Sequence, residues 1–543
     1  MRVLVVDLLA REHGRRIVTV DAIGAGPRAV AGLVEAMGYR ADLYPLEKVI
    51  EEPRILEDYD ILLASAMSSD KPAARRLAGM WRRHSNGPSV IGGPITVEPL
   101  EALKLGYEYA VYGEAESVLP EALPYIIKGE REPLYSIRGL AFRHEGRLVF
   151  TGRPPFAPPE RLNYKHSTSI EGYDAYWAAR VYVEVVRGCS NWRRPRGVLP
   201  DGRACIQCDI CARAPLAKRL YCPAYIPPGC GYCSVPAIYG YARSRSIDII
   251  VEEVRELVRK GVTRIVLSAP DVLDYGRDWL VKPNPLTDPC SPPPNLDALR
   301  ELFERLYERV PEFSTRDAYL MIENVKACLV TPSSAKLLGE YLRGTPVHLG
   351  VETGSDRHMW LIGRPITSED ARRAVRLLRE AGLEPYVYFI YGLPWETSET
   401  IRETVRLMEE LWRLGAKKIT VYKFRPLPGT AFQDFEPPGP DSASRIILRK
   451  ALELNRLAKN ELVGRVLKAV IAGWHPVRRK LVAYPLPHGP VVLVNGGRRL
   501  IGWLARVEVT GVVSERMLKG RIVRLLRRVA RVEDYRVKGL SSV

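Results

Sequence analysis

The sequence contains no cysteine before Cys189 and only two glutamines, Gln207 and Gln433, among its 543 residues. The first absence excludes a thiolate metal site in the N-terminal third of the chain, because such sites need clustered cysteine ligands. The scarcity of glutamine beside abundant arginine is typical of hyperthermophile proteins, in which thermolabile residues are depleted. No apolar run approaches the roughly 18 residues of a membrane-spanning helix, so we expect no membrane partner.

The sequence also lacks a signal-peptide pattern at its start, where residues 1–7 predict a strand. We therefore expect a cytoplasmic protein, in which thiols stay reduced and disulfides are disfavoured. On that basis the two isolated cysteines, Cys290 and Cys328, are predicted to be inert thiols.

Positive charge is concentrated toward the C-terminus. The chain carries a formal net charge of +18, and from Val463 onward 17 Lys and Arg residues stand against 4 Asp and Glu. Such a local excess is typical of a surface that binds an anionic partner, most often nucleic acid. A solvated basic surface, or a general trait of thermophile proteins, would have the same composition.

The length predicts several domains, since 543 residues exceed what one core can bury. Alternating strand and helix patterns over 1–150 predict a doubly wound, Rossmann-like parallel sheet, and a proline-rich linker is expected at 151–180. A second series at 181–440 predicts another α/β domain, followed by a helical connector at 441–462. Short strands and turns over 463–543 favour a small β-barrel. The strands expected in the two α/β domains are 3–9, 59–64, 89–91, 109–112, 181–186, 264–268, 347–351, 385–390 and 418–422.

Seven of the nine cysteines lie between Cys189 and Cys233. Cys189 ends the first expected strand of the second α/β domain, and Cys230 and Cys233 form a CxxC followed by a helical pattern. Thiolates are soft ligands that suit iron–sulfur clusters or zinc. The cysteines therefore predict a metal site at the carboxyl end of that strand.

These cysteines, together with four segments that follow them, resemble the radical SAM superfamily. The segments are 261–276, 350–356, 363–365 and 390–397. The resemblance implies a partial TIM-type (β/α) barrel in which Cys189, Cys230 and Cys233 hold a 4Fe–4S cluster. One iron of that cluster is left free for S-adenosylmethionine, and an electron donor such as ferredoxin is needed. The sequence departs from the family because residues 190–229 separate the first two cysteines, where the family has three residues.

The same resemblance implies which side chains contact S-adenosylmethionine. Tyr232 would lie against the adenine, Ser268 belongs to the loop near the amino group, and Glu352 and Arg364 would contact the ribose and the carboxylate. Each of these residues also fits an ordinary place in the core or on the surface.

The insert 190–229 holds four further cysteines, Cys205, Cys208, Cys211 and Cys222. The run CxxCxxC followed by Cys-Pro is similar to a ferredoxin run, although ten residues precede the last cysteine where ferredoxins have three. Four thiolates would close a second 4Fe–4S cluster, or hold a structural Zn²⁺ that staples an insert too small to bury a core. The spacing also permits free thiols, or replacement of Cys189 in the first cluster.

Two N-terminal segments, 89–96 and 110–116, resemble the cobalamin-binding domain of cobalamin-type radical SAM enzymes. The resemblance implies that cobalamin contacts are made by Gly92, Gly93, Gly113 and Glu114, since adjacent glycines let a backbone approach a flat ligand. The DxHxxG motif that supplies a histidine to cobalt in some relatives is absent. A domain that keeps the fold without the cofactor remains the alternative.

Three segments near the C-terminus, 491–497, 500–504 and 507–511, resemble a TRAM domain, an oligonucleotide-binding-like (OB-like) barrel of enzymes that modify tRNA and rRNA. The resemblance implies RNA as a partner, with Trp474 or Trp503 stacking on bases. Phosphate contacts are expected from Arg478, Arg479, Lys480, Arg498, Arg499 and Arg506. A basic helical face is predicted from the three- and four-residue spacing of Arg524, Arg527, Arg528 and Arg531.

Taken together, these resemblances predict a radical SAM transferase that modifies tRNA or rRNA. The predicted reaction is methyl transfer to an unactivated nucleobase carbon through a 5′-deoxyadenosyl radical. One alternative is a methylthiotransferase-like enzyme. Because the three N-terminal cysteines of methylthiotransferases are absent, its sulfur-donating cluster would have to lie in the insert. The other alternative is a non-catalytic, zinc-stabilised RNA-binding protein.

Overall fold

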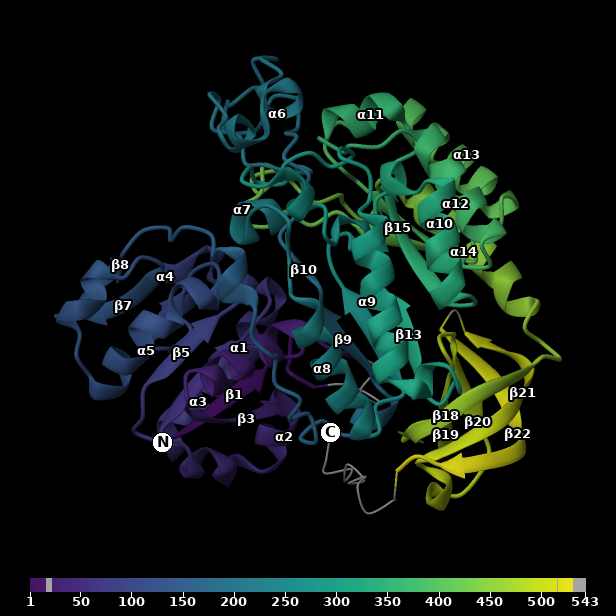
Figure 1. Cartoon of the computed structure of the whole chain (residues 1–543), viewed down its shortest axis with the longest axis horizontal. Coiled ribbons are helices and arrows are strands. Elements are labelled where there is room, and N and C mark those ends of the chain that lie inside the picture. The colour runs from purple at the N-terminus through teal and green to yellow at the C-terminus, as the bar shows by residue number, and fades with distance from the viewer. Residues whose placement is uncertain (16–21, 515, 531–543) are drawn as a thin grey trace. The chain divides into compact units, whose positions relative to one another are not determined.

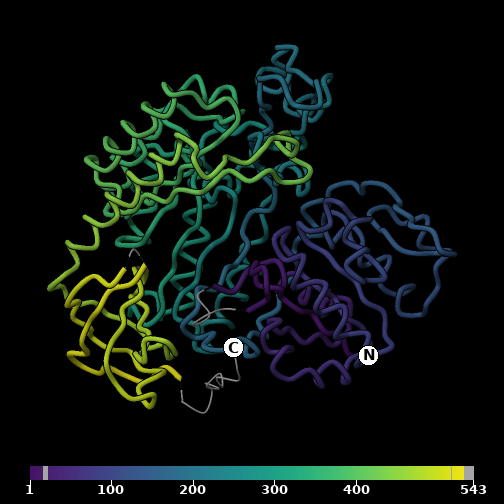
Figure 2. Tube along the Cα trace, turned by 180° about the vertical axis from the view of Figure 1, so that it is seen from behind, coloured from purple at the N-terminus to yellow at the C-terminus, as the bar shows by residue number. Residues whose placement is uncertain are grey.

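The computed structural model describes residues 1–15, 22–514 and 516–530, and Figures 1 and 2 show it from opposite sides. The chain divides into two compact units. Unit 1 comprises Met1–Val183 with Arg245–Val262, and unit 2 comprises Glu184–Ser244 with Thr263–Val543. Among the described residues, no helix is both long enough and apolar enough to cross a membrane.

Unit 1 is built on the predicted doubly wound sheet. Its seven strands lie in the order β3-β1-β4-β5-β6-β7-β8, with the first five parallel and the last two antiparallel. The parallel strands are runs of buried apolar residues, as expected for a sheet covered on both faces. Strand order reverses between β1 and β4, and such a switch point is where ligands bind on these sheets.

The strands of this sheet are β1 (Arg2–Asp7), β3 (Arg40–Pro45), β4 (Ile61–Ser65), β5 (Ser89–Gly92), β6 (Tyr109–Val111), β7 (Leu140–His144) and β8 (Arg147–Phe150). The helices of unit 1 are α1 (Ala25–Ala36), α2 (Leu46–Glu51), α3 (Lys71–His84), α4 (Pro99–Leu103), α5 (Leu119–Lys128) and α8 (Ile247–Arg259). Strand β2 (Ala22–Ile23) pairs in parallel with β9 (Arg180–Glu184).

The segment 151–180 is more than the linker that the sequence predicts. The buried guanidinium of Arg28 on α1 donates to the carbonyl oxygen of Ser167 at 2.9 Å. A Cβ on Gly32 would lie 2.4 Å from the carbonyl oxygen of Lys165, so this glycine lets the segment lie directly on α1. The segment is therefore part of the core of unit 1, which its proline content concealed.

Unit 2 contains the predicted second series of parallel strands and helices. Strands β12 and β13 pair in parallel, and β14, β15, β16 and β17 form a parallel sheet in that order. Three helices begin at a threonine that accepts a backbone N–H in a capping box: Thr331, Thr367 and Thr397. Figures 1 and 2 show the helices covering one face of these strands, as a partial barrel requires.

The strands of unit 2 that precede the C-terminal barrel are β10 (Val186–Arg187), β11 (Arg243–Ser244), β12 (Arg264–Ser268), β13 (Tyr319–Ile322), β14 (Asn324–Val325), β15 (Pro346–Glu352), β16 (Glu384–Tyr391) and β17 (Lys418–Lys423). The helices are α6 (Ile210–Arg213), α7 (Val235–Tyr239), α9 (Leu296–Arg309), α10 (Pro332–Leu342), α11 (Asp356–Leu361), α12 (Ser368–Glu380), α13 (Ser398–Arg413) and α14 (Arg445–Asn460).

The C-terminal region forms the predicted small barrel, which closes in the order β18-β19-β20-β22-β21. Its strands are β18 (Val466–His475), β19 (Lys480–Pro485), β20 (Val491–Val494), β21 (Trp503–Ser514) and β22 (Met517–Arg528).

The prediction of a basic helical face at 524–531 is wrong for its described part. Arg524, Arg527 and Arg528 lie on strand β22, and Arg531 is outside the described residues. The register between β21 and β22 shifts at Leu504, so β22 carries an extra residue there. Such bulges break the two-residue period of a strand, which explains a spacing that imitates a helix.

Candidate active site

The insert 190–229 leaves the loop that carries the cysteines and returns to it at nearly the same place. The N–H of Gly229 donates to the carbonyl oxygen of Arg193 at 2.8 Å, which ties the two ends of the insert together. Only three residues separate Cys189 from Arg193, and Gly229 directly precedes Cys230. The fold thus restores the short cysteine spacing that the linear sequence conceals.

Asn191 bridges two of the three thiols. Its backbone N–H donates to Cys189 Sγ at 3.4 Å, and its side-chain Nδ2 donates to Cys230 Sγ at 3.2 Å. The same Nδ2 also lies 3.1 Å from the carbonyl oxygen of Gly363. Cys233 follows in a tight turn, with its N–H on the carbonyl oxygen of Cys230 at 2.9 Å. Asn191, a residue that we did not predict, therefore holds Cys189 and Cys230 together, and Cys233 lies one turn from Cys230.

Burial controls the ionisation of these thiols. It raises the pKa of Cys189 to about 11 and that of Cys233 to about 12, and the neighbouring thiols add to both shifts. Within the described ranges, no three His, Cys, Asp or Glu side chains already surround a common point as metal ligands. Because thiols lose their protons when a metal binds, three adjacent cysteines, one buried and two half-buried, fit a metal that completes the site as it enters.

Three of the residues predicted to hold S-adenosylmethionine converge beside Cys230. Arg364 Nη1 lies 3.7 Å from Cys230 Sγ, and Arg364 Nη2 lies 3.9 Å from Glu352 Oε1. The phenol of Tyr232 is buried against the same group, and burial raises its pKa. Glu352 has φ +73°, a left-handed backbone angle that is rare for a residue with a side chain.

Arg364 has one hydrogen-bond donor available for a ligand. Arg364 Nε is buried and has no hydrogen-bond partner in the part of the chain that the structure describes. A buried unsatisfied donor is costly, so a polar ligand there would be stabilising. The group as a whole presents a cation, a carboxylate and a phenol, which fits the carboxylate, ribose and adenine parts of S-adenosylmethionine.

Ser268, the fourth predicted residue, has a different partner. It ends β12, and its hydroxyl donates to Glu323 Oε2 at 2.6 Å. The described contacts of Ser268 therefore involve a carboxylate on the loop between β13 and β14, and none of the cysteines.

A buried charge network holds the residue after Cys189. Lys326 Nζ donates to Ser190 Oγ at 2.9 Å, to Asp271 Oδ2 at 2.9 Å and to Asp274 Oδ2 at 2.8 Å. Arg277 also pairs with Asp274. These residues were not predicted as parts of the site. Asp271 and Asp274 do lie in the sequence segment 261–276 that carries the family resemblance.

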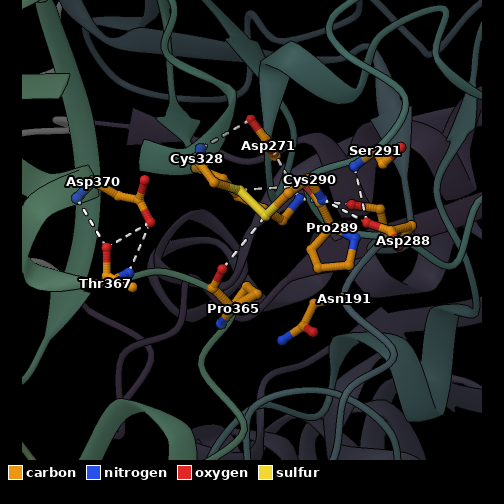
Figure 3. The surroundings of a disulfide bond; sticks show 12 residues. Asn191, Asp271, Asp288, Pro289, Cys290, Ser291, Cys328, Pro365, Thr367 and Asp370 are labelled. Atoms are coloured by element: carbon orange, nitrogen blue, oxygen red, sulfur yellow. Dashed lines mark hydrogen bonds and ion pairs between the residues drawn. A yellow bond between two sulfur atoms is a disulfide. The ribbon is translucent and has the colours of Figure 1, made fainter. Parts of the chain in front are cut away.

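The two isolated cysteines are paired, so their prediction as inert free thiols is wrong. Cys290 and Cys328 form a disulfide with a Cα–Cα distance of 5.7 Å (Figure 3). Figure 3 also shows Pro365, whose carbonyl oxygen lies 3.4 Å from Cys290 Sγ, and Asn191 nearby. The partners are separated by 38 positions in sequence. They meet because the short turn after β14 folds onto the loop before α9, which residue patterns do not reveal.

The residues predicted to contact cobalamin lie at the carboxyl edge of the unit 1 sheet. Gly92 ends β5 and Gly93 follows it, and Gly113 and Glu114 follow β6. A Cβ on Gly93 would lie 2.6 Å from the carbonyl oxygen of Ala66, and Glu114 accepts the N–H of Ala157 at 2.8 Å. These two residues therefore serve the packing of unit 1 itself. Gly92 is freer, since its Cβ would meet only Val111, at 3.9 Å.

The predicted RNA-contacting residues lie on the exterior of the C-terminal barrel. Exposed members of this basic set are Arg478, Arg479, Arg498, Arg499 and Arg506, and Lys480 is half-buried. Each predicted stacking tryptophan is covered by an arginine. The Arg498 guanidinium lies 5.2 Å from the Trp474 ring centre, and that of Arg528 lies 5.6 Å from the Trp503 ring centre.

Comparison with protein families supports the central resemblance. The family model described as the radical SAM superfamily matches residues 225–408. This range contains Cys230, Cys233 and the Glu352–Arg364 group. It begins after Cys189 and after all four insert cysteines, as expected if an insertion interrupts the loop.

Three similar proteins indicate the breadth of the relationship. An uncharacterized protein of Methanopyrus kandleri, MK0932, is 45% identical over 533 residues, which cover 97% of both chains. The ribosomal protein uS12 methylthiotransferase RimO of Thermotoga sp. (strain RQ2) is 29% identical over 316 residues, or 56% of this chain and 63% of the relative. The structure of the radical S-adenosylmethionine methyltransferase TsrM of Kitasatospora setae, with cobalamin and a [4Fe-4S] cluster bound, matches with a TM-score of 0.58. It covers 80% of this chain and 77% of that chain at 19% identity, which shows a shared fold.

Proposed function

The chain belongs to the radical SAM superfamily, and from this premise we propose that it is an RNA methyltransferase acting on a nucleobase carbon. Radical SAM enzymes use a 4Fe–4S cluster and S-adenosylmethionine, which together supply a 5′-deoxyadenosyl radical. In the proposed reaction one electron cleaves S-adenosylmethionine to methionine and this radical, which takes the hydrogen of one nucleobase C–H and leaves as 5′-deoxyadenosine. The nucleobase carbon would then receive a methyl group from methylcobalamin. The observation that carries the proposal is the position of Cys230, which shares Asn191 with Cys189 and lies against the Tyr232, Glu352 and Arg364 group.

Each residue of the site has a role in this proposal. Cys189, Cys230 and Cys233 hold the cluster and leave one iron for S-adenosylmethionine. Asn191 sets the distance between the first two thiols through its two hydrogen bonds. Arg364 and Glu352 bind the carboxylate and ribose of S-adenosylmethionine, and Tyr232 covers its adenine. Burial of the group would shield the reactive intermediate from side reactions.

Unit 1 is proposed to bind cobalamin as the source of the methyl group. Its strand order places the carboxyl ends of β1 and β4 at a switch point, where ligands of such sheets bind. The open backbone at Gly92 supports the approach of a flat ligand there. TsrM, which shares the fold, is described with cobalamin bound.

RNA is proposed as the substrate because of the C-terminal barrel. Its exposed arginines form a surface suited to phosphates, and the barrel type is common in proteins that bind oligonucleotides. The relative RimO is named for a ribosomal protein, so a protein substrate is the outcome that would redirect the proposal.

The test uses full-length protein, reconstituted with iron and sulfide under anaerobic conditions and reduced with dithionite. Wild-type protein should cleave S-adenosylmethionine to 5′-deoxyadenosine, and Cys189→Ala, Cys230→Ala and Cys233→Ala should each abolish that product. The double variant Cys290→Ala/Cys328→Ala removes a disulfide whose cysteines are not proposed as cluster ligands, and it should retain that product. Activity in a Cys189→Ala/Cys230→Ala/Cys233→Ala variant would overturn the assignment.

The substrate is tested with unfractionated RNA and separately with ribosomal protein, followed by mass spectrometry of nucleosides and peptides. A new methylated nucleoside that requires added cobalamin supports the proposal. Methylation of peptides alone would replace RNA by a protein substrate. A methylthio group in either product would favour the second candidate, methylthio transfer, which the 29% identity to RimO over 316 residues supports.

A further inference from the structure

The four cysteines of the insert line one pocket. Cys205, Cys208, Cys211 and Cys222 share it with Arg194, Arg196 and other insert residues. Cys205 and Cys222 pack against a small apolar core of unit 2 that includes Leu199 and Ile226, whereas Cys208 is exposed. The pocket therefore has a fixed inner wall and an open outer side.

The insert contains little regular secondary structure. Its helices are the four-residue α6, labelled in Figure 1, and one 3₁₀ turn at Leu216–Leu220. The buried Arg194 guanidinium substitutes for a core, since it donates to the carbonyl oxygens of Trp192, Arg219, Leu220 and Ile226 at 2.9–3.2 Å. These hydrogen bonds close the base of the insert, and nearer the cysteines Arg196 pairs with Asp209, the residue after Cys208, at 2.6 Å.

The backbone around Cys208 bends toward the pocket. Gln207 and Asp209, on either side of Cys208, have left-handed φ values of +53° and +54°. Such residues are uncommon outside glycine and mark a tightly wound loop. Winding a CxxCxxC loop in this way lets three thiols face one point, and left-handed turns of this type recur at iron–sulfur sites.

We propose that the insert binds a second 4Fe–4S cluster through Cys205, Cys208, Cys211 and Cys222. Three cysteines at two-residue spacing with a distant fourth before proline match the pattern of cluster-binding ferredoxin runs. Structural zinc sites more often use two separated pairs of ligands. Arg194, Arg196 and Asp209 line the pocket, with Arg196 paired to Asp209, and the net positive charge of these three side chains suits a cluster whose four thiolates make it anionic.

Four thiolate ligands have a chemical consequence. They saturate the four irons, so this cluster has no iron free for S-adenosylmethionine or for a sulfur atom to be donated. The second cluster is thus distinct in kind from the one held by Cys189, Cys230 and Cys233.

The experiment counts metals in full-length protein after anaerobic reconstitution. Wild-type protein should hold about eight irons and eight sulfides, as two 4Fe–4S clusters require. Two variants should each hold about four irons and four sulfides. They are the triad variant, Cys189→Ala/Cys230→Ala/Cys233→Ala, and the insert variant, Cys205→Ser/Cys208→Ser/Cys211→Ser/Cys222→Ser. The double variant Cys290→Ala/Cys328→Ala should keep about eight. In electron paramagnetic resonance, S-adenosylmethionine should alter the reduced signal of the insert variant and leave that of the triad variant unchanged.

One zinc per chain with about four irons, all lost in the triad variant, would overturn this inference and leave the proposed function intact. Four irons retained by the triad variant would sustain it even if no S-adenosylmethionine is cleaved. The triad variant thus keeps the test decisive should the insert variant fail to fold.

Discussion

Lys326 is the residue whose removal should cost most outside the cysteine site. Its ammonium lies between the buried carboxylates of Asp271 and Asp274, and these raise its pKa although burial alone would lower it. We predict that Lys326→Met lowers the free energy of unfolding by about 3–5 kcal/mol, because two buried carboxylates lose their cation. Guanidinium titration measures this change.

The matched control is Lys336→Met on α10, where the lysine is exposed. It should change the free energy of unfolding by no more than about 0.5 kcal/mol. Equal effects of the two substitutions would mean that the buried network contributes no more than a surface charge.

Glu396 gives the molecule a pH-dependent contribution to stability. Burial raises the pKa of its carboxyl group to about 7, although the N–H of Gly392 donates to it at 3.0 Å. The folded state therefore binds this proton more tightly than the unfolded state. The stabilisation is complete below the ordinary pKa of 4.5 and is lost as pH rises through about 7.

We predict that Glu396→Gln flattens the pH dependence of the free energy of unfolding between these two values. Up to one proton is involved, so the slope should change by at most about 1.4 kcal/mol per pH unit. Glu399→Gln, at an exposed carboxylate on α13, should leave the slope unchanged. An unaltered slope in Glu396→Gln would assign the dependence to other groups.

At the scale of elements, α14 closes the open edge of the β14–β17 sheet. Strand β17 pairs with β16 on one side, and Asn455 on α14 serves the other side. Its Oδ1 accepts the N–H of Ile419 at 2.9 Å, and its Nδ2 donates to the carbonyl oxygen of Ile419 at 2.6 Å. One side chain thus takes the place of a neighbouring strand, which protects an edge that could otherwise pair with another chain.

We predict that Asn455→Ala destabilises unit 2 by about 1–3 kcal/mol, because two backbone groups lose their partner. It should also increase the rate of hydrogen exchange at the amide of Ile419. Asn460→Ala, at the exposed end of the same helix, serves as the control and should change neither quantity. Unchanged exchange at Ile419 in Asn455→Ala would exclude the proposed edge role.

At the scale of the whole molecule, the basic surface of the barrel should govern RNA binding. We predict that replacing Arg478, Arg479, Arg498 and Arg499 with alanine weakens RNA affinity. The dependence of log affinity on log salt should also become shallower, by about 0.7 for each phosphate of single-stranded RNA that the variant no longer neutralises. Filter binding across a salt series measures both effects.

The control changes the net charge equally at other exposed sites of unit 2, by replacing Arg309, Lys336, Arg402 and Arg406 with alanine. It should preserve most of the affinity and the slope. If both sets of substitutions weaken binding alike, the barrel surface is not specific and net charge alone attracts the RNA.

The sequence by itself determined the class of each domain and most of the strands. Strands β12, β15, β16 and β17 lie where they were expected, because buried parallel strands are apolar runs bounded by glycine, proline and charged residues. The cysteine spacing and the segments around Glu352 and Arg364 were sufficient to predict the superfamily. Each of these features lies within a short stretch of sequence, and periodicity and motifs are read from such short stretches.

Only the tertiary structure decided which distant groups meet. The bond from Gly229 to Arg193, the bridging role of Asn191, the Cys290–Cys328 disulfide and the course of β22 all depend on contacts across a loop or on a change of register. Loop length changes the entropy of such contacts only slowly, so many pairings are nearly equal in cost until packing selects one. That selection is made by the folded core as a whole, and no short stretch of residues records it.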